Sequence, residues 1–199
     1  MTELASRSWR GVPVLVTGAD GFIGSWVAER LLDEGAEVVI LKRDRPAHSR
    51  LRIDGVEERC TVALGDLSDH TALLRVLNEY GVETVFHLAA QSFPGRSWEE
   101  PVGTCRTNLL GTVNLLEALR LAAPAARVVV AGSSSEYAPS PAPLTEESAM
   151  DPASPYAVSK LAAEHYVRAI GALYRIETVI LRIFNAYGTL SGVPASHPP

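Results

Sequence analysis

Short apolar runs alternate along the chain with longer segments in which apolar residues recur every three to five positions. The short runs are rich in β-branched residues and predict strands buried on both faces of a sheet, at residues 12–16, 37–41, 61–64, 82–88, 127–131 and 177–183. The longer segments predict helices that each bury one face, at residues 22–32, 68–77, 102–122 and 153–174. Because strand and helix alternate throughout, the pattern predicts an α/β fold: a doubly wound parallel sheet, the Rossmann arrangement, with helices on both faces.

The chain predicts a single domain over residues 1–188, with no internal repeat or linker. Residues 189–199 are rich in Gly, Ser and Pro, and we expect them to be poorly ordered. Residues 138–155 are rich in Pro, Ser and Ala and lack a helical period, which predicts a loop over the carboxyl edge of the sheet. Active sites are built on such edges.

Composition and charge narrow the class of protein. With 199 residues, of which 47% are hydrophobic and 21% charged, the chain can bury the core of a soluble domain. The formal net charge of -5 gives no general attraction to a polyanion, so nucleic acid is not an expected partner. No apolar run approaches the roughly 18 residues that span a bilayer, and the N-terminus has no apolar signal region. We therefore expect no membrane association and a cytoplasmic location.

Two cysteines, Cys60 and Cys105, form no CxxC pair and lie inside apolar segments. This pattern predicts buried free thiols, with neither a disulfide nor a metal site.

Three glycines, Gly18, Gly21 and Gly24, lie where the first predicted strand passes into the first helix. Glycines there permit a tight turn and a close approach of backbone N–H groups to a pyrophosphate, and the helix dipole favours that anion. Glycines also mark ordinary turns, but the strand, helix and second strand around this triplet favour a dinucleotide site.

The end of the second strand bears on the choice of cofactor. Lys42 and Arg43 occupy the usual place of the side chain that selects the ribose substituent, and cations there favour the 2′-phosphate of NADP. Asp44 could still bind the ribose hydroxyl of NAD, so NAD stays open. After the third strand, Asp66 could place its carboxylate near an adenine ring or cap the next helix, and both interpretations stand.

The segment that carries most information contains Tyr156 and Lys160. Four residues apart on a predicted helix, they share one face, and a lysine cation close to a phenol lowers its pKa from about 10 toward neutrality. A hydroxyl donor should complete the site, and Ser133, Ser134 and Ser135 stand at the end of the fifth strand. The pattern is typical of acid–base chemistry on a hydroxyl or carbonyl group.

These motifs resemble the extended short-chain dehydrogenases/reductases, in their order along the chain. The likeness rests on Thr17 to Gly24, Gly65-Asp66-Leu67, His87 to Gln91, Asn108 to Thr112, Ser133 to Tyr137, Ser154 to Lys160 and Arg182 to Asn185. Within that group the chain is similar to the NAD-dependent nucleotide-sugar epimerases and dehydratases, most of all to 4,6-dehydratases of the GDP-mannose or CDP-glucose type.

The resemblance implies a chemistry for the site. Tyr156 would take the proton of the sugar 4-hydroxyl while hydride leaves C4, and Lys160 would tune Tyr156 and hold the nicotinamide ribose. A dehydratase also needs a carboxylate that assists loss of the C6 hydroxyl, for which Glu136 is the candidate. Alignment on Tyr137 makes Ser133 the catalytic hydroxyl and alignment on Glu136 makes it Ser134; we favour Ser133.

Other activities fit the same motifs. A nucleotide-sugar 4-epimerase or a 4-keto-sugar reductase needs no carboxylate such as Glu136, and a non-catalytic dinucleotide-binding regulator could use the same fold. The resemblance also implies a set of cofactor contacts: Gly18, Asp20, Gly21, Phe22, Ile23, Gly24, Lys42, Arg43, Asp66, Leu67, Leu88, Ala89, Ala90, Asn108, Tyr156 and Lys160. Asn108 would support the backbone of the active site.

The resemblance carries three further expectations. Relatives have a mostly C-terminal lobe that grips the nucleotide-sugar substrate, and this sequence largely lacks it, so cofactor binding should survive better than turnover. Residues 92–100 would form a mobile flap near the sugar, with Trp98 either a substrate contact or an anchor of the loop. The helices near 102–122 and 153–174 would pair with a second copy into a four-helix bundle, giving a homodimer.

Overall fold

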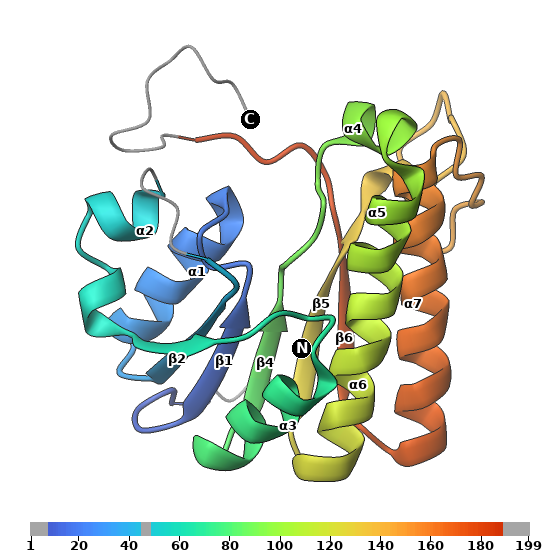
Figure 1. The fold of residues 1–199 in the computed structure, drawn as a ribbon. Coiled ribbons are helices and arrows are strands. Elements are labelled where there is room, and N and C mark those ends of the chain that lie inside the picture. The colour runs from blue at the N-terminus through green and yellow to red at the C-terminus, as the bar shows by residue number, and fades with distance from the viewer. Residues whose placement is uncertain (1–7, 45–48, 189–199) are drawn as a thin grey trace.

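A computed structural model describes residues 8–44 and 49–188 of the chain. Six strands and the helices between them alternate along these residues (Figure 1). The strands are β1 (Pro13–Thr17), β2 (Glu37–Lys42), β3 (Thr61–Leu64), β4 (Thr84–His87), β5 (Arg127–Ser133) and β6 (Thr178–Ile183). The α-helices are α1 (Phe22–Asp33), α2 (Arg50–Ile53), α3 (His70–Glu79), α4 (Pro94–Glu99), α5 (Pro101–Cys105), α6 (Gly111–Ala122) and α7 (Pro155–Tyr174). Shorter helical turns are η1 (Glu57–Arg59), η2 (Arg106–Leu110) and η3 (Ser134–Glu136).

All six strands run parallel in one sheet of order β3-β2-β1-β4-β5-β6. The direction of winding reverses between β1 and β4, so the connections that leave these two strands diverge and open a crevice at their carboxyl ends. The predicted doubly wound parallel sheet is confirmed.

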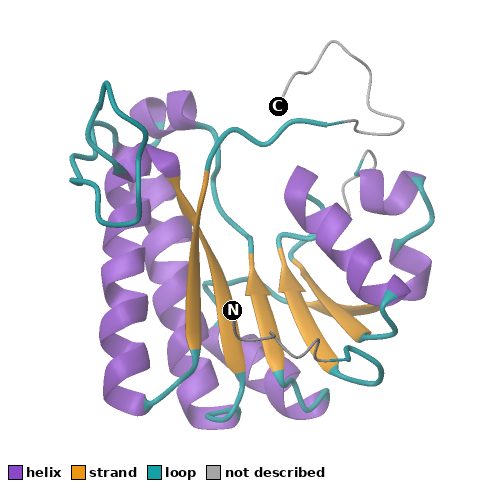
Figure 2. Ribbon diagram, turned by 180° about the vertical axis from the view of Figure 1, so that it is seen from behind, coloured by secondary structure: helices purple, strands orange, loops and turns teal. Residues whose placement is uncertain are grey.

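Two apolar cores lie on opposite faces of the sheet. On one face α3, α6 and α7 bury Leu15, Val85 and Val128 among their own leucines and valines. On the other face α1 and α2 cover Val14, Val16 and Ile40. Seen from behind in Figure 2, α1 and α2 stand over one half of the sheet, and no helix of the described residues covers the other half. Val179 and Leu181 of β6 accordingly stay 40% and 47% exposed.

The predicted elements are confirmed, with ends that shift by up to two residues. The long helix expected at 102–122 is divided, since the wider π-helical turn η2 lies between α5 and α6. Part of the expected flap is the helix α4, which begins at Pro94. The helix α2 and the turn η1 were not predicted, because four or three residues are too few to show a period. The tail 189–199 lies outside the described residues.

The cysteine prediction is half wrong. Cys60 is partly buried, and burial raises the pKa of its thiol to about 11, whereas Cys105 is exposed on α5. The two thiols are free. In the part of the chain that the structure describes, no helix has both the length and the apolar character needed to cross a membrane.

Candidate active site

A cavity of about 920 Å³ extends across the carboxyl ends of the strands. It is lined by residues of the β1–α1 turn, the ends of β2 and β3, the segment after β4, the end of β5 with its serines, and Tyr156 and Lys160 of α7. All the predicted site residues lie within the described ranges, and all but Asn108 and Glu136 line this cavity. The fold therefore brings residues from six separate segments of the chain to one cavity.

The glycine turn is built so tightly that side chains are excluded. Gly18 has φ +75°, and a Cβ there would lie 2.6 Å from the backbone N of Ala89. A Cβ on Gly24 would lie 2.1 Å from the carbonyl oxygen of Gly18. Gly21 occupies the N-cap of α1 without a side chain to bind the first N–H groups of the helix. Those N–H groups therefore face the cavity as donors, which suits the pyrophosphate of a dinucleotide.

A buried polar chain holds the strand ends under this turn. His87 binds the Thr17 hydroxyl through Nδ1 at 2.8 Å and the Thr112 hydroxyl through Nε2 at 2.9 Å. Thr112 in turn donates to the carbonyl of Asn108, and the Ala89 N–H donates to Thr17. Burial, helped by the charge of Lys160, lowers the pKa of His87 to about 3, so the ring is neutral and links its two partners. Polar residues inside apolar strands were the sequence signal for this chain, but the sequence did not indicate their partners.

Asn108 braces the backbone instead of contacting the cavity. Its Oδ1 accepts from the Gln91 N–H at 2.7 Å, and its Nδ2 donates to the Gln91 carbonyl and to the Ser159 hydroxyl at 3.1 and 3.0 Å. Ser159 donates to the Tyr156 carbonyl, so Asn108 connects the segment after β4 to the helix turn that carries Tyr156. These hydrogen bonds fit the expected support of the backbone, and the buried Asn108 side chain does not line the cavity.

The helix that carries Tyr156 starts at a well-formed cap. The Ser154 hydroxyl accepts from the Ala157 N–H at 3.1 Å, and Pro155 follows at the first helical position. This start places Tyr156 in the first turn of α7, at the cavity wall near Ser133 at the end of β5, and of the serines only Ser133 affects the pKa of the phenol. Of the two possible registers of the serine turn, the geometry therefore favours Ser133.

The charge state of the pair departs from the expectation. Burial raises the pKa of Tyr156, and the Ser133 hydrogen bond only partly opposes it. The Lys160 Nζ donates to the Ala131 carbonyl at 2.7 Å, and burial lowers the pKa of this ammonium to about 8. Lys160 lies one helical turn from Tyr156 with one donor on β5, and the expected lowering of the tyrosine pKa is outweighed by the burial of the phenol.

The turn after β3 decides between the two interpretations of Asp66. Asp69 caps α3, since its carboxylate accepts from the Ala72 N–H at 3.0 Å. Asp66 lines the cavity and accepts from both the hydroxyl and the N–H of Ser68, which holds the pKa of its carboxyl below the usual range. Asp66 is therefore free of the helix cap and stays ionised at the cavity wall.

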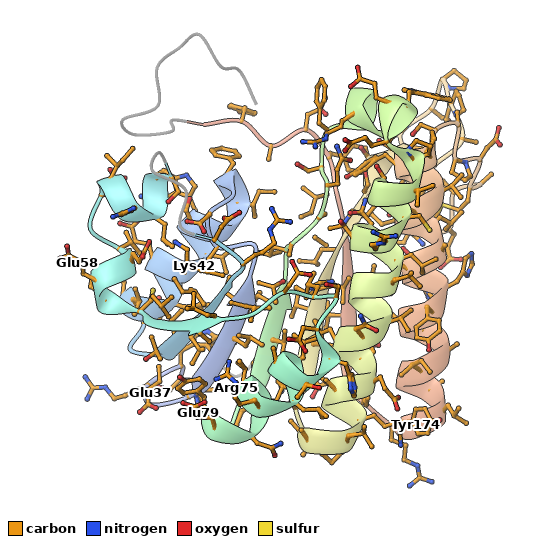
Figure 3. All side chains as sticks on the ribbon, in the orientation of Figure 1. Glu37, Lys42, Glu58, Arg75, Glu79 and Tyr174 are labelled. Carbon is orange, nitrogen blue, oxygen red and sulfur yellow. The ribbon has the colours of Figure 1, made fainter. Side chains whose placement is uncertain are left out.

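Lys42 is already neutralised by two carboxylates. Its side chain is 0% exposed, and its Nζ contacts Asp20 of the glycine turn at 3.0 Å and Glu57 at 2.7 Å. Figure 3 labels Lys42 in the interior, while Glu58, next to Glu57, projects outward from the edge of the fold. The nearby Arg43 is 72% exposed. Lys42 is thus a poor ligand for a second phosphate, and of the two predicted cations only Arg43 is placed for that role.

Lys42→Met is expected to weaken NADH and NADPH binding by a similar factor, on the order of tenfold, since it releases Asp20 and the glycine turn instead of removing a phosphate ligand. The unfolding free energy should fall by at most about 3 kcal/mol, the low end for breaking a buried ion pair, because both carboxylates keep some water contact. Titration calorimetry of wild type and variant with NADH and with NADPH measures the loss of affinity for each cofactor. Arg43→Ala is the matched comparison, and loss of NADPH binding alone in Lys42→Met would restore Lys42 as the phosphate ligand.

A family model described as GDP-mannose 4,6 dehydratase matches residues 15–196. The chain belongs to this family. Two members of the wider group illustrate the likeness: the GDP-mannose 4,6-dehydratase sdnI of Sordaria araneosa is 38% identical over 157 residues, and the UDP-glucose 4-epimerase of Mycolicibacterium smegmatis is 38% identical over 180 residues. The matched parts are 77% of this chain and 29% of the dehydratase, and 87% of this chain and 56% of the epimerase.

A comparison with solved structures agrees with this family assignment. The UDP-glucose 4-epimerase of Brucella ovis, solved in complex with NAD, superposes with a TM-score of 0.80 at 33% identity, covering 88% of this chain and 52% of the epimerase. The chain thus spans about half the length of most of the relatives it matches. The family is that of nucleotide-sugar dehydratases and epimerases, which confirms the resemblance carried by the motifs.

Proposed function

We propose that the protein is an NAD(P)-dependent nucleotide-sugar-modifying enzyme that works through a transient 4-keto sugar. The proposal depends on one observation: Tyr156 and Ser133 line the same cavity as the glycine turn. A nicotinamide dinucleotide held by that turn would supply hydride acceptance and return. Tyr156 would take the proton of the sugar 4-hydroxyl, Ser133 would hydrogen-bond the same oxygen, and Lys160 would stabilise the phenolate.

The first candidate activity is a 4,6-dehydratase, in keeping with the family whose model matches the chain. After oxidation at C4, loss of the C6 hydroxyl needs an acid and base at C5 and C6, a role expected of Glu136. The Glu136 side chain is 0% exposed and does not line the cavity, so this step requires either movement of the serine turn or another carboxylate.

The second candidate is a 4-epimerase or a 4-keto-sugar reductase, and the burial of Glu136 favours it. Both reactions exchange hydride and a proton at C4 alone. Ser133, Tyr156 and Lys160, which line the cavity, are sufficient for such an exchange. An assay that follows the product of UDP-glucose and GDP-mannose by mass separates the candidates, because dehydration removes one water and epimerisation leaves the mass unchanged.

The choice between NAD and NADP depends on the side chain that would meet the ribose 2′-substituent of the cofactor. Arg43 is the cation that remains for a 2′-phosphate, and it lies 3.9 Å from Asp66 and 3.5 Å from Asp44. We propose NADP binding through Arg43 as the first hypothesis, with NAD as the alternative that the solved epimerase complex supports. Titration of the chain with NADPH and NADH tests the choice, and we expect either cofactor to bind more tightly than any nucleotide-sugar. Tight binding of a nucleotide-sugar by these residues would contradict the expected lack of a substrate lobe.

We also propose that two copies of the chain assemble into a homodimer. α5, α6 and α7 pack together along one side of the fold (Figure 1), with η2 between α5 and α6. This side exposes apolar side chains, since Val102, Leu110 of η2 and Val158 are 69%, 51% and 52% exposed. A second copy packed on this surface would give the expected four-helix homodimer. A mass measurement in solution tests it, and a monomer at high concentration would contradict it.

A further inference from the structure

Behind the serine turn, three buried charged side chains meet from different elements. Glu136 comes from η3, Glu164 from α7 and Arg182 from β6. Glu136 and Glu164 are 0% and 3% exposed. The cluster is separate from the cavity but touches it through one residue, since the Oε1 atom of Glu136 accepts from the Ser133 N–H at 2.6 Å. This bond closes a capping box with the Ser133 hydroxyl, which accepts from the Ser135 N–H at 3.1 Å.

The guanidinium of Arg182 is committed to partners other than Glu136. Its Nε and Nη2 donate to the two carboxylate oxygens of Glu164 at 2.9 and 2.6 Å, and its Nη1 donates to the Tyr137 hydroxyl and the Glu146 carbonyl, both at 2.8 Å. The Glu136 Oε2 atom lies 3.8 Å from Arg182 Nε, beyond hydrogen-bond reach. Glu164 accepts a further bond from Arg168 at 3.0 Å.

One oxygen of Glu136 therefore faces a carboxylate. Within the described residues Oε2 receives no N–H or O–H bond, and the carboxyls of Glu136 and Glu164 both lie against the Arg182 guanidinium, at 3.8 and 2.6 Å. Two ionised carboxylates cannot share a hydrogen bond, because neither has a proton to donate. Glu164 is the carboxylate stabilised by two arginines, so the proton belongs on Glu136.

We propose that Glu136 is protonated and acts as a positioning residue for Ser133, donating its proton to Glu164 while its carbonyl oxygen accepts from the Ser133 N–H. The serine turn is thereby held between α7 and β6, with the Ser133 hydroxyl against Tyr156. The role assigned to Ser133 rests on the proposed function, but the proton on Glu136 does not.

The electrostatics around the cluster agree with this assignment. Burial, and then the neighbouring Glu164, raise the pKa of Glu136 to about 7, although the Ser133 N–H opposes the shift. Burial alone would raise the pKa of Glu164, but its bonds to Arg182 and Glu136 lower it to about 2. The other charged or titratable groups that face the cluster are Lys160, Tyr156 and Arg168 of α7 and Tyr137 of the adjoining loop.

The pH dependence of stability tests the proton. A carboxyl whose pKa is raised by folding costs no stability below its unfolded pKa, near 4.5, and costs progressively more as pH rises toward about 7. Glu136→Gln keeps both hydrogen bonds, since its amide oxygen accepts from Ser133 and its NH₂ group donates to Glu164, but it does not titrate. We expect the Tm of Glu136→Gln to match wild type near pH 5 and to exceed it by several degrees near pH 8.

The controls separate a proton from a general effect of substitution. Glu146→Gln changes an exposed carboxyl and should leave the Tm profile parallel to that of wild type. The infrared spectrum of wild type minus Glu136→Gln should contain a protonated-carboxyl band near pH 6 that disappears as pH rises past about 7. A lower Tm in Glu136→Gln at every pH, or no such band, would mean that Glu136 is ionised and would overturn the proposal.

Catalysis provides the second readout. With UDP-glucose or GDP-mannose and cofactor, Glu136→Gln should keep C4 oxidation within a few-fold of wild type, whereas Glu136→Ala should lower kcat much more than it raises KM. A dehydratase that uses Glu136 as its acid and base would instead lose water elimination in Glu136→Gln. If wild type oxidises neither sugar, the proposed function fails while the Tm profile and the infrared band still decide the proton.

Discussion

Tyr156→Phe is expected to lower the rate of sugar oxidation at C4 by about 10²–10⁴-fold, the usual contribution of a positioned acid or base. The substitution removes only the hydroxyl, and the ring remains packed at the start of α7. Because the Tyr156 side chain is only 8% exposed, a base from solvent has poor access to the sugar oxygen that the phenol would contact. The measurement is the single-turnover rate at which NADH or NADPH forms transiently with UDP-glucose and GDP-mannose, at saturating cofactor.

Cofactor affinity should change little in Tyr156→Phe, because the glycine turn and the wall at Ala89 supply most of the surface of the site. Tyr166→Phe on the same helix is the matched control, since Tyr166 packs beside the core and does not line the cavity. It should keep both the rate and the affinity. A variant at Tyr156 that retains oxidation within a few-fold would remove the tyrosine from the mechanism and with it the oxidoreductase step.

The fold was predictable because its signals are local. A strand buried on both faces needs a run of apolar β-branched residues, and a helix on a sheet needs one apolar stripe, so β1, β3 and α7 could be located from the sequence alone. The glycine turn and the Tyr156–Lys160 pair were predictable for the same reason, since each depends on spacing within one element. The structure brings them to one cavity as expected.

The predictions that did not hold depend on which distant side chain meets which. Lys42 is positioned by sequence for a phosphate, but Asp20 and Glu57, 22 and 15 residues away, neutralise it. Glu136 is next to the serines in sequence, yet it is buried near Glu164 and Arg182, contributed by α7 and β6, and does not line the cavity. A single sequence contains these partners but does not show their pairing, because charge partners across a fold have no fixed spacing.

Gly24→Ala is expected to abolish dinucleotide binding, by at least about 100-fold or roughly 2.7 kcal/mol. The new Cβ would lie 2.1 Å from the Gly18 carbonyl oxygen and 2.9 Å from the Ala19 Cα, and both atoms belong to the backbone of the turn. A backbone atom cannot rotate away as a side chain can, so the turn must open and lose its fit to a pyrophosphate. The unfolding free energy should also fall, by about 1–3 kcal/mol or more, as in other overpacked sites.

Two other glycines make the test of Gly24 specific to the cofactor turn. A Cβ on Gly21 would lie 3.2 Å from the same carbonyl oxygen, so Gly21→Ala should weaken NADH binding less than Gly24→Ala does. Gly55, with φ +71° and open space around it, should lose about 1–2 kcal/mol of stability as alanine and bind cofactor normally. Calorimetric titration with NADH and NADPH, with thermal unfolding of each variant, distinguishes these results. Equal cofactor affinity in Gly24→Ala and Gly55→Ala would mean that the dinucleotide does not bind at this turn, because a ligand seated there cannot tolerate the displaced Gly18 carbonyl.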